Sequence, residues 1–155
     1  MKKIKLYLDN CCFNRPYDDQ EHIKIKIESE AKIYIQEKIK EGVFDLCWSY
    51  ILDFENDKNP QKERRLEIVK WKRIAKFDIE EHDELLNTMN ELILSGLKPL
   101  DALHISCAID GECNYFLTVD RGILKKSYVT KKILIMSPID FINEAEELSN
   151  DKHRN

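Results

Sequence analysis

The sequence lacks any continuous apolar segment long enough for a signal peptide or a transmembrane helix, and it contains no repeat, linker or low-complexity stretch. We therefore expect no membrane association. A length of 155 residues fits one domain that buries roughly two thirds of its unfolded surface. The formal net charge of −4 excludes a polycation that binds nucleic acid over its whole surface, so any such contact needs a local basic patch.

The cysteines form no motif. Cys11, Cys12, Cys47, Cys107 and Cys113 are odd in number, include no CxxC pair, and show no metal-ligand spacing to the four histidines. This pattern predicts reduced thiols in a cytoplasmic protein. It also favours a packing role for the adjacent pair Cys11-Cys12 over zinc or redox chemistry.

Short apolar runs alternate with longer helical stretches, which predicts an α/β fold with a parallel sheet covered by helices. Strands are expected at residues 4–8, 44–48, 115–118 and 132–135, with a weaker fifth strand at 76–79. Helices are expected at 20–40, 50–56, 61–73, 80–94, from Pro99 onward, and at 138–148. We expect one domain over residues 1–148 and a disordered polar tail at 149–155.

Four acids lie at comparable places in this pattern. Asp9 directly follows the first strand, Glu55 and Asp120 come soon after later strands, and Asp101 lies at the start of an apolar helix. Ligands of open α/β sheets bind outside the carboxyl ends of the strands. Since Mg²⁺ and Mn²⁺ prefer carboxylate oxygens, the four acids predict a site for a hard divalent cation.

The orientation of Glu55 follows from helical geometry. Ser49 is a good N-cap, and rotation by about 100° per residue places Glu55 only about 40° from Ile51, on the apolar stripe, while Asp53 points away. An inward carboxylate is costly unless it is paired or metal-bound. An ion pair with a lysine remains the alternative.

Asp101 and Asp120 also have simpler explanations. Asp101 complements the dipole at the first turn of its helix, and Asp120 is well placed to cap a short helix. His104, one turn after Asp101, is expected in the core or behind a ligand rather than on the metal. The metal hypothesis depends on the set of acids rather than on any one of them.

Other polar residues are candidates for phosphate or metal-water contacts. Asn14, Arg15 and Thr118 lie next to the acids, although the first two also suit a turn before Pro16. Basic residues concentrate at 58–76 and again at 125–132, where they form either a nucleic-acid surface or a solvated face.

Several segments together resemble a PIN domain: LDNCCFNRP at residues 8–16, Trp48-Ser49 followed by Glu55, KPLDALH at 98–104, and FLTVD at 116–120. The resemblance covers about residues 3–145 and is greatest to small prokaryotic PIN proteins, including toxins of the VapC type. It implies a three-layer α/β/α sandwich with a central parallel sheet.

The resemblance further implies a Mg²⁺- or Mn²⁺-dependent ribonuclease in which Asp9, Glu55, Asp101 and Asp120 bind the metal and carry the catalysis. RNA is then the substrate, and an antitoxin protein and a homodimer are the expected partners. Where many relatives have Asp-Thr/Ser-Asn, this chain has Asp9-Asn10-Cys11 and loses a hydroxyl, which Asn10 is expected to replace.

The residues present agree with this chemistry. Cleavage of a phosphodiester requires an activated water and a neutralised phosphate, and carboxylate-bound divalent ions supply both. The sequence offers no Ser-His-Asp order, glycine-rich phosphate loop or histidine pair instead. The main alternative is a non-catalytic PIN module that binds metal or protein. A phosphoacceptor receiver domain is disfavoured because the first strand lacks two adjacent acids.

Overall fold

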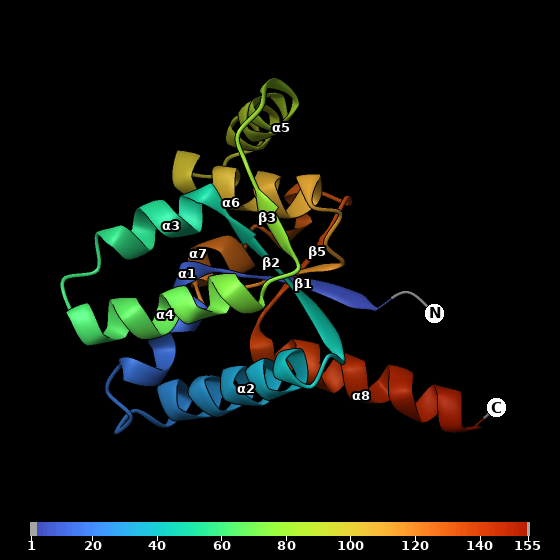
Figure 1. Ribbon diagram of the computed structural model, residues 1–155. Helices are drawn as coiled ribbons and strands as arrows, with labels where there is room; N and C mark the ends of the chain where they lie inside the picture. Colours follow the sequence, from blue (N-terminus) through green and yellow to red (C-terminus); the bar gives the residue numbers. More distant parts are fainter. Residues whose placement is uncertain (1–2, 155) are drawn as a thin grey trace.

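The computed structural model of the chain describes residues 3–154 (Figure 1). Its strands are β1 (Ile4–Leu8), β2 (Phe44–Ser49), β3 (Phe77–Ile79), β4 (Tyr115–Leu117) and β5 (Leu134–Met136). Its helices are α1 (Asn10–Asn14), α2 (Ile23–Lys40), α3 (Tyr50–Asp57), α4 (Lys62–Ile74), α5 (Asp83–Leu94), α6 (Pro99–Asp110), α7 (Arg121–Leu124) and α8 (Pro138–Arg154). Short 3₁₀ turns occupy Arg15–Tyr17 and Ser127–Val129.

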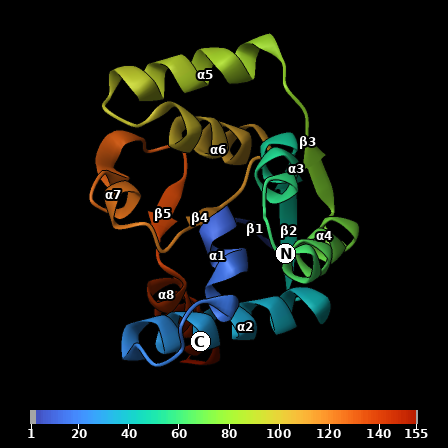
Figure 2. The same cartoon turned by 90° about the vertical axis from the view of Figure 1, so that its left-hand side faces the viewer.

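All five strands are parallel and lie in the order β3-β2-β1-β4-β5. Helices α5 and α6 cover one face of the sheet, and α2 and α8 pack together on the other (Figure 2). The fold is therefore a three-layer α/β/α sandwich of the PIN-like kind, as the sequence predicts. The central position of β1 brings the end of that strand between the ends of β2 and β4.

The apolar runs of the sequence become strands because both faces of the sheet are covered. Leu6, Tyr7 and Leu8 are consecutive and fully buried, as is typical of a strand enclosed between two helix layers. Helix α6 is buried on most sides, as its apolar composition predicts. Parallel strands place all their carboxyl ends at one edge, where the candidate acids follow them.

Most predicted elements are present with shifted ends. Strand β5 begins at Leu134, because the backbone N–H of Lys132 donates to Thr130 Oγ1 in a turn. Helix α8 continues beyond the end predicted at Leu148 and reaches Arg154, because residues 149–154 contain neither proline nor glycine to stop it. Asn155 lies outside the described residues.

Helix α1 is not predicted by the periodicity of its residues. It forms because the Asp9 side chain caps it by accepting a hydrogen bond from the backbone N–H of Asn10. Among the helices of residues 3–154, none is both long and apolar enough to cross a membrane.

Candidate active site

Asp9 is held firmly at the end of β1. Its backbone N–H donates to the carbonyl of Leu117 at 2.9 Å, which fixes it against β4. Its Oδ1 accepts from the backbone of Asn10 at 2.8 Å, and its Oδ2 accepts from Thr118 Oγ1 at 2.8 Å and from Cys11 Sγ at 3.3 Å. Asp9 is only 8% exposed, so these donors replace the water that the carboxylate loses.

The thiol of Cys11 takes the place of the hydroxyl that the sequence lacks after the first strand. The neighbouring Cys12 thiol, followed by burial, raises the pKa of Cys11, so the thiol keeps its proton and donates to Asp9. The expectation that Asn10 replaces the hydroxyl is wrong in this respect. Only the backbone of Asn10 contacts Asp9, and its buried side-chain Oδ1 has no hydrogen-bond partner among the described residues.

Thr118 links two of the acids. Its fully buried hydroxyl donates to Asp9 and accepts from the backbone N–H of Asp120 at 3.1 Å. This arrangement gives Thr118 a role in positioning two carboxylates. That Thr118 also contacts the substrate stays a prediction.

Glu55 is oriented by a buried polar chain that crosses three elements. Ser49 caps the start of helix α3: its Oγ accepts from the backbone N–H of Leu52 and also lies 2.6 Å from the Tyr7 hydroxyl. That hydroxyl lies 2.7 Å from Nδ1 of His104 on α6, and Nε2 of His104 hydrogen-bonds to Glu55. The inward orientation predicted for Glu55 is confirmed, with a histidine rather than a lysine as its partner.

The local charge controls the protonation of His104. Burial by itself lowers the pKa of this histidine, but the hydrogen bond to Glu55 and the negative charges of nearby carboxylates outweigh burial and raise it above the ordinary value. Asp9 and Asp101 contribute to this effect, so the imidazole senses acids from β1 and α6 as well as its direct partner on α3.

Asp101 lies close to two other acids. It occupies the first turn of α6 and is half-buried. Burial raises the pKa of Asp101, and the negative charges of Asp120 and Asp9 raise it further. Asp101 is thus near enough to Asp120 and to Asp9 to be repelled by both.

Asp120 performs the capping role that the sequence suggests for it. Its Oδ1 accepts from the backbone N–H groups of Gly122 at 2.7 Å and Ile123 at 3.2 Å, at the start of α7. The residue is exposed. Capping uses one carboxylate oxygen and leaves Oδ2 without a partner among the described residues.

The chemistry of this donor set fits a hard cation, because its members are carboxylate oxygens with unrelieved mutual repulsion. The buried, unpartnered Oδ1 of Asn10 adds an oxygen acceptor next to Asp9. Among the residues whose side chains the structure describes, 3–147, however, no three His, Cys, Asp or Glu side chains are arranged closely enough to hold a metal ion. The acids lie at one edge of the sheet without a preformed coordination sphere.

Asn14 and Arg15 stabilise the loop after α1. Asn14 donates to the carbonyl of Asn10 and accepts from Asn59, which ties this loop to the segment between α3 and α4. Arg15 pairs with Asp18 at 3.2 Å and with the buried Glu28 at 3.5 Å. These contacts agree with the structural alternative for both residues, and their predicted contact with phosphate stays a prediction.

Many cations of the basic stretch 58–76 have partners within the fold. Lys62, Arg73 and Lys76 are exposed and make no such contact with the described residues. The internal contacts are Lys58 over the Phe54 ring, Arg64 with the Tyr17 carbonyl, Arg65 with the Asn59 carbonyl, Lys70 with Glu67, and Lys72 with Asp53.

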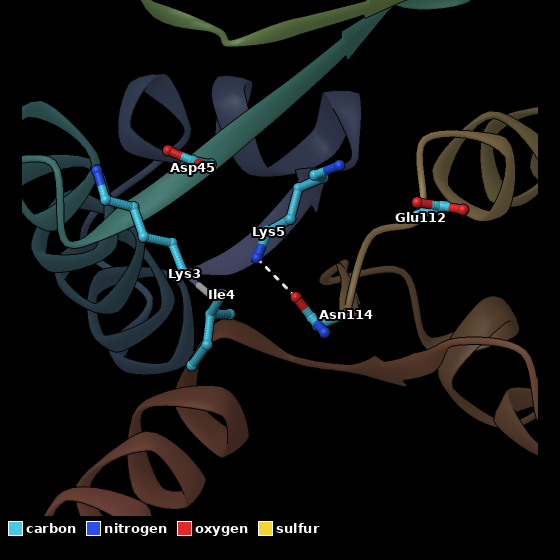
Figure 3. Close-up of a pocket in the computed structure, with 6 residues that line it drawn as sticks. All are labelled: Lys3, Ile4, Lys5, Asp45, Glu112 and Asn114. Carbon is cyan, nitrogen blue, oxygen red and sulfur yellow. Dashed lines mark hydrogen bonds between the residues drawn. The ribbon is translucent and has the colours of Figure 1, made fainter. Parts of the chain in front are cut away.

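A hollow of about 510 Å³ lies at the opposite edge of the sheet, where the strands begin (Figure 3). Lys5 lines it, but the Lys5 ammonium donates to the carbonyl of Gly111 at 2.8 Å and lies 3.6 Å from the centre of the Phe77 ring. The backbone N–H of Lys5 also donates to Asn114 (Figure 3). This hollow is separate from the candidate site at the carboxyl ends of the strands.

Sequence reasoning missed Tyr7 and Cys11 as parts of this site. Tyr7 appears in the sequence as an apolar strand residue, and the hydroxyl that joins β2 to α6 gives no local signal. For Cys11, its position two residues after Asp9 was the available signal, since relatives of the resembled family have a hydroxyl in this loop.

The chain is similar in structure to VapBC2 from Rickettsia felis, solved in complex with a DNA fragment from the promoter of that system. The match has a TM-score of 0.53 and 12% sequence identity, and it covers 85% of this chain and 97% of the other. The sequence matches no protein-family model and no curated protein. At this identity the likeness establishes the fold alone.

Proposed function

We propose that this chain is a Mg²⁺- or Mn²⁺-dependent endoribonuclease, and that it acts as the toxin of a toxin–antitoxin pair. The observation that carries the proposal is the gathering of Asp9, Asp101 and Asp120 at the carboxyl edge of the sheet, where burial and then the charges of Asp120 and Asp9 raise the pKa of Asp101. Glu55 faces the same region through His104. The structural likeness to VapBC2 supports the same reading.

Each acid has a distinct role in this proposal. Asp9 is the fixed ligand, because four donors and acceptors around it define its position. Asp101 and the free oxygen of Asp120 would supply further ligands, and His104 holds Glu55 in place. A bound divalent cation supplies Lewis acidity and a water of lowered pKa. The carboxylate oxygens of Asp9, Asp101 and Asp120 would hold such a cation and offset its charge.

The proposal predicts that removing one charge abolishes cleavage. Asp9→Asn or Asp101→Asn should lower the rate of Mn²⁺-dependent RNA cleavage by more than about 100-fold, because even a group that only orients a metal ligand is worth about 10- to 100-fold. The assay uses purified protein with single-stranded and hairpin RNAs, and the fragments should carry 5′-phosphates. Circular dichroism spectra should match those of the wild-type protein.

Asp57→Asn is the matched control, because Asp57 is an exposed acid at the end of α3, the helix that carries Glu55. It should keep wild-type activity. Asp53 is unsuitable as a control, since it accepts from Trp48 Nε1 and from Lys72, both at 3.0 Å. Full activity in Asp9→Asn, or equal loss in Asp57→Asn, would remove the acids from the mechanism.

A non-catalytic module that binds metal or protein is the second candidate. Within residues 3–147 no three His, Cys, Asp or Glu side chains lie close enough to hold a metal ion, and this favours the protein-binding form of the module over the metal-binding form. Intact RNA across the whole substrate panel, with Mn²⁺ present and no partner protein, would establish this alternative. For the nuclease and for the non-catalytic module alike, the proposed protein partner is an antitoxin. Co-purification of this chain with the product of a neighbouring gene tests that partnership.

A further inference from the structure

A groove of about 260 Å³ lies on the side of the molecule where α2 and α4 meet the segment after β1. Aromatic side chains make its walls: Phe13 from α1, Tyr17 from the following 3₁₀ turn and Trp71 from α4. Two polar residues of α2, Lys32 and Gln36, also line it. None of these residues belongs to the acid site described above.

Lys32 is a buried cation without an anionic partner. It is 4% exposed, and its ammonium lies 5.5 Å from the centre of the Phe13 ring and 6.0 Å from that of Trp71. It makes no hydrogen bond or ion pair with any side chain that the structure describes. Glu28, one turn earlier on α2, is the natural partner at this spacing, but it pairs with Arg15 at 3.5 Å.

Gln36 lines the same groove and carries a second unused donor. It lies one turn after Lys32 and is 7% exposed, and its buried Nε2 has no hydrogen-bond partner among the described residues. A buried amide without a partner is costly, and so is the ammonium of a largely buried lysine that has no counter-ion. Two such groups one helical turn apart indicate a position built to donate to a ligand.

The acid at the rim of the groove does not fill this need. Glu67 lines the groove from α4, but its carboxylate pairs with Lys70 at 2.7 Å and more than half of its side chain is exposed. Lys40, also on α2, lies 5.2 Å from the centre of the Trp71 ring and adds positive charge. The unmet donors and the surrounding charge therefore favour an anion that enters from outside.

We propose that this groove binds a carboxylate carried by an aromatic or apolar group, with Lys32 and Gln36 as the two donors. A carboxylate has two acceptor oxygens, which match one ammonium and one amide N–H. A phosphate brings more oxygens and more charge than these two donors satisfy. The body of the ligand lies against the rings of Tyr17 and Trp71, where it gains contact area.

The electrostatics of the empty groove agree with this assignment. Burial lowers the pKa of Lys32 to about 7, and the charge of Lys40 lowers it as well, although Cys12 has the opposite effect. A carboxylate beside the ammonium restores its ordinary preference for the charged form. The site is independent of the proposed nuclease activity, so the two can succeed or fail separately.

Phenylacetate is the probe that tests the proposal, because it joins a carboxylate to one aromatic ring. A titration followed by NMR should give saturable shifts at the Gln36 side-chain amide and the Trp71 indole. 2-Phenylethanol, the neutral analogue, should bind at least about tenfold more weakly, because it cannot pair with the buried charge. A peptide with a free C-terminal phenylalanine distinguishes the source: tighter binding than phenylacetate assigns the carboxylate to a chain end, and weaker binding to a small acid.

The variants separate recognition from simple apolar contact. Lys32→Met keeps an unbranched side chain that is one atom shorter and uncharged, and it should weaken phenylacetate binding by about tenfold or more. Lys26→Met, at an exposed position on the same helix, should bind like the wild-type protein. Absence of shifts with phenylacetate, equal affinity for 2-phenylethanol, or undiminished affinity in Lys32→Met would each overturn the proposal.

Discussion

At the scale of single residues, Lys32 makes a prediction about stability. Burial lowers its pKa from 10.5 to about 7 in the folded chain. Between these values the unfolded chain binds more protons at this site, so the free energy of unfolding rises with pH in that window. Lys32→Met removes the buried charge, and it should stabilise the protein below about pH 7 by an amount on the order of a few kcal/mol.

The advantage of Lys32→Met should shrink as the pH rises toward about 10, because the wild-type lysine then folds in its neutral form. Urea unfolding at about pH 6 and about pH 9 measures the difference in free energy of unfolding between Lys32→Met and the wild-type protein. Lys26→Met, at an exposed position, is the control. A stability difference that is constant across this range would contradict the assigned burial.

The directions in which the side chains of one helix point could be predicted from the sequence, whereas hydrogen bonds between different helices and strands could not. The helical rotation correctly separates Glu55, which faces buried His104, from Asp53, which faces Trp48 and Lys72. In contrast, the hydrogen bonds of Tyr7 to His104 and of Thr118 to Asp9 join residues separated by 97 and 109 positions. Periodicity carries no information about which polar groups meet over such distances.

At the scale of elements, local chemistry predicts helix starts well. Ser49 and Asp120 both cap helices as their residue types suggest. Helix α1 escaped prediction because its cap is Asp9, a residue whose position after a strand suggested only a ligand role. The Asp9 carboxylate therefore both caps helix α1 and belongs to the candidate site. A sequence pattern predicts one role for such a residue and misses the second.

The end of α6 depends on the absence of a side chain at Gly111. A Cβ added there would lie 2.8 Å from Cys47 Sγ and 3.2 Å from Ile79 Cδ1, on strands β2 and β3. Gly111→Ala should therefore destabilise the fold by about 1–3 kcal/mol through overpacking. Thermal and urea unfolding measure the change.

Cys47→Ala supplies the matched test of this close approach, because it removes the nearer of the two atoms. The double variant Gly111→Ala with Cys47→Ala should lose less stability than the two single changes added together. Strict additivity would mean that the contact between α6 and β2 does not limit the size of residue 111.

At the scale of the whole molecule, the parallel sheet gathers acids that come from distant parts of the chain. Asp9, Asp101 and Asp120 follow β1, begin α6 and follow β4, and their repulsion is a strain on the folded state. Because the pKa of Asp101 is raised in the fold, its ionised form destabilises the protein near neutral pH. Asp101→Asn should therefore raise the melting temperature of the metal-free protein.

A divalent cation should relieve the same strain in the wild-type chain. Mn²⁺ at about a hundred times its dissociation constant should stabilise the folded state by about 2.7 kcal/mol through linkage, and Asp101→Asn should respond much less. Differential scanning fluorimetry of both proteins, with and without Mn²⁺, measures the effect, and Asp57→Asn should respond like the wild-type protein. If Mn²⁺ at millimolar concentration leaves the wild-type melting temperature unchanged, the acids do not form a cation site, whatever the outcome of the RNA assays.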